Sequence, residues 1–288
     1  MNKSLSTIFL IFCSLGWISA APIHEAVAKS DLSTIEMELQ NGIDINLPIK
    51  KGLPQEGFTP LALAITEMNL DAMKMLLANG ANVNDPIQYG EAEGYSPLIL
   101  AASLQGLRPL QLLVDHGADV DRKNPFGHAK DFTPLYAATQ EGLLENASFL
   151  ISNNANVNLK GPKGTTALTF AAEHGQVEIT ELLLSKGADI NTQSNKGITP
   201  LMIAVSKGNL EIVTLLANSN ADINLKSESG FTALNVANDL GETKMIQFLK
   251  SKGAVANTSK VSPIKVMVLT GLCIIAVSVL AIRQITKI

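Results

Sequence analysis

The chain has 288 residues, enough for one large domain or two small ones, and aromatic residues make up only 5% of it. An apolar content drawn from Leu, Ala, Ile and Val favours many small helices over an aromatic-rich sheet core. The formal net charge is −4, but it is unevenly distributed. The region between Lys3 and Lys265 holds all 26 acidic and 18 of the 22 basic residues, so its formal charge is −8. This acidic middle argues against nucleic acid as a partner, because neutralising phosphates requires a basic surface.

Residues 1–20 have the layout of a cleaved secretory signal peptide. Lys3 supplies a positive start, Ile8–Ile18 forms an apolar run of 11 residues, and small residues follow. The run is too short to span a bilayer comfortably as a helix, and we predict cleavage after Ala20. The alternative is an uncleaved N-terminal anchor.

Residues 21–254 contain one pattern that recurs along the chain. Six copies of an apolar start, of which FTPLALAI at Phe58 is an example, are separated by 37, 37, 33, 33 and 33 residues, and a degenerate first copy, APIHEAVA, begins at Ala21. A second apolar stretch follows each start. The copies begin near residues 21, 58, 95, 132, 165, 198 and 231.

Each copy carries signals for two helices. A Ser or Thr hydroxyl opens six copies where an N-cap would accept a hydrogen bond, and Pro follows it in four of the six, at the first helical position. Each second helix is predicted to stop at a residue that tolerates the left-handed conformation. These residues are Gly42, Gly80, Gly117, Asn154, Gly187, Asn220 and Gly253.

The recurring start and its 33-residue spacing resemble the ankyrin repeat, whose first helix begins T-P-L-H-x-A. The resemblance covers residues 21–254 and implies an all-α ankyrin-repeat solenoid of about seven repeats, built of helix–turn–helix units with β-hairpin fingers. One departure is the histidine of the motif, which only the first copy keeps, as His24. The polar Asn146 replaces an apolar residue of the following copies, so we expect the fourth repeat to be locally weaker.

Three consecutive fingers are longer than the others. Finger 1 (residues 47–57) has eleven residues, and finger 2 (residues 85–94) and finger 3 (residues 122–131) have ten each, against six for residues 192–197. In ankyrin-repeat proteins the finger tips usually contact the partner, so the resemblance makes the long fingers a predicted binding surface. The alternative is that surface loops tolerate insertions at little cost. The candidate partner-binding residues are Lys50, Lys51, Tyr89, Glu91, Glu93, Arg122, Lys123, Phe126, His128 and Lys130.

The chain ends in a predicted membrane anchor. Residues 255–263 read as a polar linker and residues 264–282 as a transmembrane helix, whose uncharged stretch Val266–Ile282 would span about 25 Å. A buried helix of the soluble part is the alternative. Arg283 and Lys287 in the tail, residues 283–288, predict that this end stays in the cytoplasm and that the repeats lie outside it.

No enzymatic motif stands out. The sequence lacks the nucleophile-elbow, zinc-protease and phosphate-loop patterns, and its two cysteines, Cys13 and Cys273, lie in the apolar ends. The paired Asp and Asn residues recur in nearly every copy, which favours turn hydrogen bonding over acid–base chemistry. We therefore predict no enzyme activity, no cofactor, no metal site and no small-molecule substrate.

The sequence as a whole predicts an exported, membrane-tethered protein that binds a partner protein, most simply in a bacterial inner membrane with the repeats facing the periplasm. Two alternative functions fit the same sequence features. One is a chaperone-like or regulatory partner of an exported enzyme, and the other is an effector-like binder of host proteins.

Overall fold

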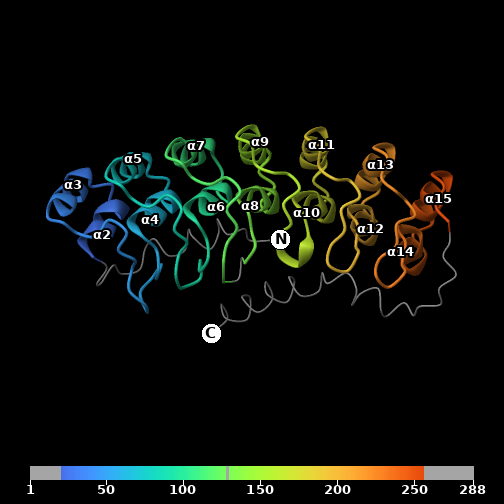
Figure 1. Cartoon of the computed structure of the whole chain (residues 1–288), viewed down its shortest axis with the longest axis horizontal. Coiled ribbons are helices and arrows are strands. Elements are labelled where there is room, and N and C mark those ends of the chain that lie inside the picture. Colours follow the sequence, from blue (N-terminus) through green and yellow to red (C-terminus); the bar gives the residue numbers. More distant parts are fainter. Residues whose placement is uncertain (1–20, 128–129, 256–288) are drawn as a thin grey trace. The chain divides into compact units, whose positions relative to one another are not determined.

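The computed structural model describes residues 21–127 and 130–255. Contacts between Cα atoms divide the chain into two units, unit 1 ending at Pro162 and unit 2 beginning at Lys163. Within the described residues, all regular structure is helical, arranged as successive helix pairs joined by fingers (Figure 1).

The helices form pairs along the chain. The first helix of each pair is called the inner helix, and the second is called the outer helix. Unit 1 contains α2 (Pro22–Ala28), α3 (Leu32–Gln40), α4 (Pro60–Thr66), α5 (Leu70–Ala78), α6 (Pro97–Ala102), α7 (Leu107–Asp115), α8 (Pro134–Gln140) and α9 (Leu144–Ser152). Unit 2 contains α10 (Ala167–His174), α11 (Val177–Ser185), α12 (Pro200–Ser206), α13 (Leu210–Asn218), α14 (Ala233–Leu240) and α15 (Thr243–Ser251). A short 3-10 turn, η1 (Pro162–Gly164), lies at the boundary between the units.

The predicted helix starts are confirmed. At α4 the Thr59 hydroxyl accepts a hydrogen bond from the Ala62 amide at 3.2 Å, with Pro60 at the first helical position. The same cap recurs at the other predicted Ser and Thr positions, so six inner helices begin where the sequence placed them. The capping residues are Thr59, Ser96, Thr133, Thr166, Thr199 and Thr232.

The predicted ends of the outer helices are confirmed as well. All seven glycine and asparagine residues named above have positive φ, from 67° at Asn220 to 89° at Gly253. A left-handed residue here lets the next amide bond back to the helix, as when Ala81 N donates to Leu76 O at 3.0 Å. The chain then leaves the helix pair and enters the finger.

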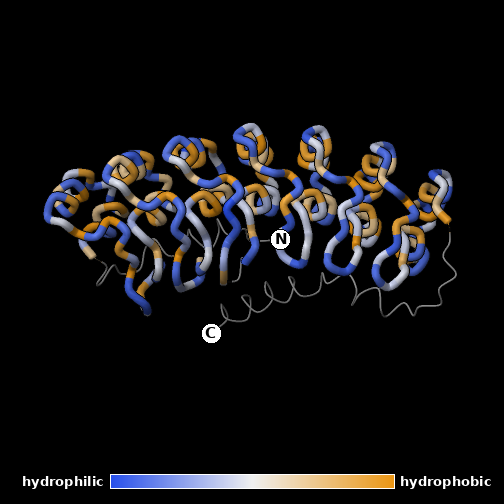
Figure 2. Tube along the Cα trace, viewed as in Figure 1, coloured by the Kyte–Doolittle hydropathy of each residue, from blue (hydrophilic) through white to orange (hydrophobic). Residues whose placement is uncertain are grey.

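Inner and outer helices bury different shares of their surface. In α4 every residue from Pro60 to Ile65 is buried, whereas α7 buries only Pro109, Leu110 and Leu113. Figure 2 shows the apolar residues concentrated in the helices and hydrophilic ones along the fingers. Since one helix pair cannot bury its own apolar face, the core of each unit lies between stacked pairs.

The fingers differ from the predicted β-hairpins, because no strand forms among the described residues. Finger 1 is closed by only two backbone bonds, from Ile49 N to Phe58 O at 2.9 Å and from Gly57 N to Ile49 O at 2.8 Å. The rest of the finger folds into turns, so the ladder is too short to count as a strand. The prediction of β-hairpin fingers is therefore wrong in this respect, and the fingers are turn-rich loops with a hairpin-like base.

Neither predicted hydrophobic end segment belongs to the part of the chain that is described. The signal peptide at residues 1–20 and the transmembrane helix at residues 264–282 both lie outside the described residues. Within the described residues, no helix has the length and apolar character needed to cross a membrane.

Candidate protein-binding surface

Within each unit, the paired Asp and Asn residues at the finger bases link one repeat to the next. Their side-chain oxygens accept from backbone amides in their own turn, as predicted, and from the following repeat. In unit 1, Asn82 N donates to Asn46 Oδ1 at 2.8 Å and Asp119 N donates to Asn84 Oδ1 at 3.0 Å. In unit 2, Asp222 N donates to Asn191 Oδ1 at 2.8 Å. These residues are structural and set the spacing of the fingers.

Fingers 1 and 2 touch through a pair of glycines. A Cβ atom placed on Gly57 would lie 2.2 Å from the carbonyl oxygen of Tyr89, and one placed on Gly90 would lie 2.4 Å from the carbonyl oxygen of Glu56. The two contacts are reciprocal, and both glycines have positive φ, 83° and 93°. Only glycine permits so close an approach of the two backbones.

Fingers 2 and 3 repeat the arrangement. A Cβ atom on Gly94 would lie 2.1 Å from Phe126 O, and one on Gly127 would lie 2.2 Å from Glu93 O. A side chain adds a further link between fingers 1 and 2, since the hydroxyl of Tyr89 donates to Ile49 O at 2.9 Å. The three long fingers of unit 1 are therefore held together as one continuous edge.

The extra residues of the long fingers are folded rather than loose. In finger 1, Leu53 N donates to Lys50 O at 3.3 Å, Glu56 N donates to Leu53 O at 3.1 Å, and the Glu56 carboxylate accepts from Gly52 N. In finger 2 the matching turn is closed from Glu93 N to Gly90 O at 3.1 Å. Internal turns of this kind fix the direction in which the tips point.

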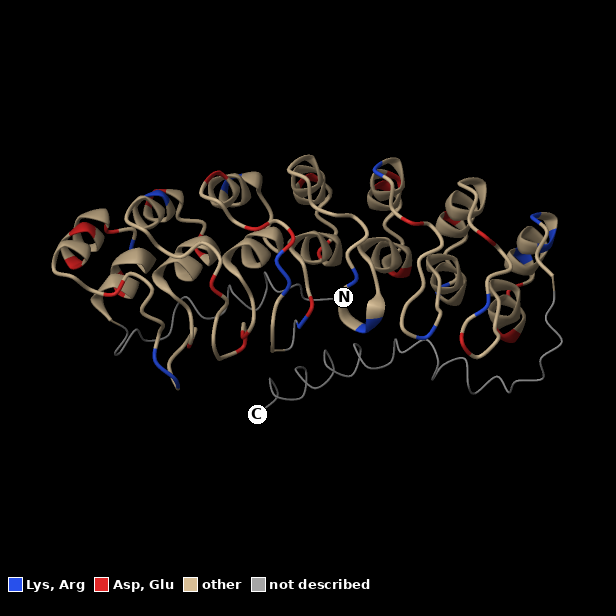
Figure 3. Ribbon diagram, in the orientation of Figure 1, with Lys and Arg blue, Asp and Glu red and all other residues tan. Residues whose placement is uncertain are grey.

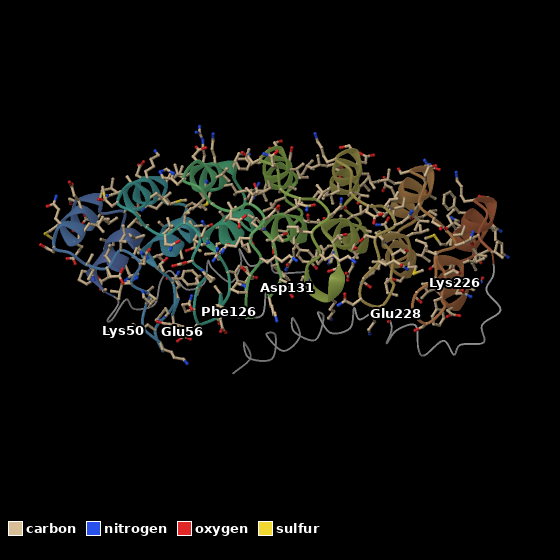
Figure 4. All side chains as sticks on the ribbon, viewed as in Figure 1. Lys50, Glu56, Phe126, Asp131, Lys226 and Glu228 are labelled. Carbon is tan, nitrogen blue, oxygen red and sulfur yellow. The ribbon has the colours of Figure 1, made fainter. Side chains whose placement is uncertain are left out.

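The structure separates the predicted partner-binding residues into two groups. Lys50, Lys51, Glu91, Lys123 and Lys130 are exposed, whereas Tyr89, Glu93, Arg122 and Phe126 are half-buried. His128 lies outside the described residues. Figure 3 shows the charged residues along the fingers, and in Figure 4 the labelled Lys50, Glu56, Phe126 and Asp131 lie on the finger side of unit 1.

Finger 3 contains a buried amide that the sequence analysis missed. Asn124 is 1% exposed, and within the described residues neither its Oδ1 nor its Nδ2 has a hydrogen-bond partner. Its backbone closes finger 3 as that of Ile49 closes finger 1 and that of Ile87 closes finger 2. Comparing the three finger bases by register would have found this position, since an amide there replaces two isoleucines.

A half-buried carboxylate near finger 2 was also missed. Glu141 is the C-cap residue of α8, and burial raises its pKa. Tyr95 directly follows finger 2, and burial, together with the charge of Glu141, raises the pKa of Tyr95 to about 12. The interaction shows that the half-buried carboxylate of Glu141 lies close to Tyr95, the residue next to finger 2.

The buried side chain of Asn146 in the fourth repeat is hydrogen-bonded to the preceding repeat. Its side chain is 1% exposed, and Nδ2 donates to Ala102 O at 3.2 Å and to Leu104 O at 2.7 Å in the preceding repeat. Asn69, the N-cap of α5, makes the equivalent link by donating to Val27 O at 3.1 Å. At α9 the N-cap is Leu143, which cannot cap, so Asn146 supplies the link from within the helix.

The three described histidines bond main-chain carbonyls. His24 is fully buried with Nε2 2.9 Å from Leu47 O, and burial lowers its pKa, which keeps the ring neutral. His116 Nδ1 lies 2.8 Å from Leu112 O and His174 Nδ1 lies 3.1 Å from Phe170 O. No group of three or more potential metal ligands gathers within the described residues.

The family follows from a comparison of the sequence with family models. The model described as ankyrin repeats matches three times, over residues 23–124, 124–194 and 191–260. The chain belongs to the ankyrin-repeat family. Its ankyrin repeats match the crystal structure of the human ASB11 ankyrin repeat domain with a TM-score of 0.67 and 24% identity, covering 83% of this chain and 100% of that chain. At this identity the likeness concerns the fold alone, and no curated protein sequence matches the chain.

Ankyrin repeats bind partner proteins, and the confirmed family therefore implies protein–protein interaction. The three long fingers of this ankyrin-repeat protein lie against one another within unit 1. They offer an edge with exposed charges and two half-buried aromatic rings, which is a composition suited to protein recognition.

Proposed function

We propose that this chain is an exported, membrane-tethered ankyrin-repeat protein that captures a partner protein with the three long fingers of unit 1. The observation that carries the proposal is the reciprocal glycine contact between fingers 1 and 2 and between fingers 2 and 3. Loops held in one conformation lose little entropy on binding, so the edge is prepared for a partner. Insertions tolerated merely because they are neutral would not require matched glycines on both sides.

The tethered and exported location is supported by the sequence. A signal-like segment at residues 1–20 and an uncharged stretch at Val266–Ile282 followed by Arg283 together predict a type I orientation. We place the repeats outside the cytoplasm, with a bacterial inner membrane facing the periplasm as the proposed setting. The protein acts in this proposal as a binding module and carries out no catalysis.

The binding role is tested by shortening a long finger. In the variant, residues 85–94 of finger 2 are replaced by the six residues of the short finger 192–197. We expect cross-linked capture of the partner from intact membranes to fall strongly, because the exchange removes Gly90 and the tip of finger 2. Exchanging residues 225–230 for the same six residues is the control, since it leaves unit 1 intact. Unchanged capture by the finger 2 variant, with helicity retained, would refute the role of the fingers.

The topology is tested with reporters fused after Ala254. Alkaline phosphatase is active only after export, whereas a conventional fluorescent protein is fluorescent only when it stays in the cytoplasm. We expect an active phosphatase fusion and a dark fluorescent fusion. The opposite pair of results would place the repeats in the cytoplasm and refute export.

A further inference from the structure

The formal charges of the three long fingers change sign from one finger to the next. Finger 1 carries Lys50 and Lys51 with Glu56, and finger 2 carries Asp85, Glu91 and Glu93. Finger 3 carries three basic residues, Arg122, Lys123 and Lys130, with Asp131. The formal charges of the fingers are therefore +1, −3 and +2, within a middle region that is acidic overall.

These charges are available to a partner. The side chains of Lys50, Lys51, Glu91, Lys123 and Lys130 are exposed and that of Glu93 is half-buried. None of the six has an ion-pair partner within the described residues, where the pairs found join other side chains. By contrast, the carboxylate of Glu56 already accepts from Gly52 N, so finger 1 presents mainly its two lysines.

The order of the charges is fixed by the backbone. Glycine contacts bring finger 1 against finger 2 and finger 2 against finger 3, so the three sets of charges lie side by side in that order. Helices that pack side by side lie about 8–10 Å apart, so neighbouring fingers are separated by about one Debye length at physiological salt. A partner therefore meets three distinct patches rather than one averaged charge.

We propose that fingers 1–3 form a docking edge for a protein whose matching surface is acidic, basic and acidic in that order; this rests on the proposed function and specifies its partner. The docking edge consists of Lys50, Lys51, Glu91, Glu93, Lys123 and Lys130. Charge complementarity across such an edge sets register and rejects partners that would bring like charges together.

The charge order argues against the other occupants. A second copy that engages all three fingers about a two-fold axis would set finger 2 against finger 2 and finger 1 against finger 3, which brings like charges together at every position. A uniform polyanion such as a nucleic acid or an anionic lipid surface would meet the acidic finger 2 at the centre of the edge. A heterologous protein with alternating charge satisfies all three fingers.

The test uses two synthetic peptides with identical blocks in different order. One carries acidic, basic and acidic blocks separated by Gly-Ser spacers, and the other carries the same three blocks in the order acidic, acidic and basic. The full chain is compared with a variant in which all six docking-edge charges are reversed by Lys→Glu and Glu→Lys. We expect the full chain to bind the first peptide about tenfold more tightly than the second, with the preference inverted in the variant.

Equal binding of the two peptides, no binding of either, or a preference that survives charge reversal would overturn the proposal. Vesicles of phosphatidylserine and of phosphatidylcholine test the lipid alternative. Binding to the anionic vesicles that the reversed variant loses would assign the edge to lipid and also overturn it. A far-ultraviolet circular dichroism spectrum and a urea midpoint like those of the unchanged chain verify that the variant is folded.

Capture from intact membranes separates this proposal from the function on which it rests. If the charge-reversed variant captures the same partner as the unchanged chain while the shortened finger 2 variant does not, the charge order is wrong and the binding role of the fingers stands. If the shortened variant also captures that partner, the binding role itself fails.

Discussion

The two units join neighbouring fingers in different ways. In unit 2 the junction is a backbone hydrogen bond, from Asn195 N to Lys163 O at 2.9 Å and from Glu228 N to Lys196 O at 3.1 Å. In unit 1 the junction between long fingers consists of two glycines, each lying against the carbonyl of the residue that precedes its partner, as at Gly94 and Gly127. One repeat pattern thus supports two kinds of finger contact.

The two kinds of junction tolerate different residues. Any residue except proline can supply a backbone amide, and the donors in unit 2 are Asn195 and Glu228. Only the finger that accepts the hydrogen bond needs a glycine, as at Gly197. A carbonyl packed against a Cα leaves no room for a Cβ on either side, so unit 1 needs glycine twice. Unit 1 should therefore be the more sensitive to substitution at its fingers.

The largest effect is expected from Gly94→Ala. The new Cβ would lie 2.1 Å from Phe126 O and would sit on a residue with φ of 88°, so the two long fingers must separate. We expect a loss of about 3 kcal/mol in the free energy of unfolding of unit 1. Urea unfolding followed by tyrosine fluorescence measures it, because Tyr89, Tyr95 and Tyr136, the three tyrosines of the chain, all lie in unit 1.

Gly52→Ala is the matched control for the close approach. Gly52 has a φ of 87° in finger 1, but nothing lies within 4 Å of its added Cβ, so only the conformational strain applies. A loss of about 1 kcal/mol is expected. Equal losses for Gly94→Ala and Gly52→Ala would mean that the contact between fingers contributes nothing.

The second prediction concerns Asn146, which links two repeats within unit 1. Asn146→Ala removes the donor to Ala102 O and Leu104 O and should cost about 2 kcal/mol, measured by urea unfolding of unit 1. Asn146→Ile, the residue found at the same position in two later copies, should also destabilise, because both carbonyls still lose their partner.

A double variant distinguishes the lost link from a packing defect. Leu143→Asn combined with Asn146→Ile places an asparagine at the N-cap, as at Asn69, where the side chain both caps the helix and reaches the preceding repeat. We expect the double variant to recover most of the stability lost in Asn146→Ile. Failure to recover would show that the N-cap position of α9 cannot reach the carbonyls that Asn146 serves.

The smallest effect is expected at Glu141 and depends on pH. Since burial raises the pKa of this carboxyl in the folded chain, its ionisation costs stability at neutral pH, and the cost is absent below its ordinary pKa of 4.5. Glu141→Gln should therefore raise the unfolding midpoint at pH 7, with the gain disappearing as the pH falls below 4.5. The exposed Glu145→Gln serves as control and should change little. A gain that persists in acid would assign the effect to packing instead.

The sequence predicted the parts of the fold that depend on neighbours along the chain. The hydroxyl at Thr59 reaches an amide three residues on, and Asn154 takes up the left-handed conformation at a helix end, so both could be read from local pattern. The predicted β-hairpins were wrong, because a strand requires a ladder of backbone hydrogen bonds between two segments. The extra residues of the long fingers form turns instead. The predicted signal peptide and membrane anchor stay predictions.

The candidate surface was predicted only as a set of long fingers. Its residues were named from charge and finger length, but the bond from Tyr89 to Ile49 O, the buried amide of Asn124 and the raised pKa of Glu141 depend on segments far apart in the chain. The expectation that Asn146 weakens its repeat was made without the two hydrogen bonds of its side chain, whose acceptors lie 42 and 44 residues earlier, and it stays a prediction that the Asn146→Ile variant tests.

The repeat, its helix starts and ends, and the positions of the extended fingers could be predicted from the sequence, because they follow from backbone preferences and side-chain spacing along the chain. The edge formed by the long fingers became visible only in the folded chain. That edge depends on Gly57, Gly90, Gly94 and Gly127 meeting backbone carbonyls more than 30 residues away in the sequence. In a sequence, a glycine indicates only a flexible backbone. The folded chain shows that these four glycines lie where a neighbouring backbone leaves no room for a side chain.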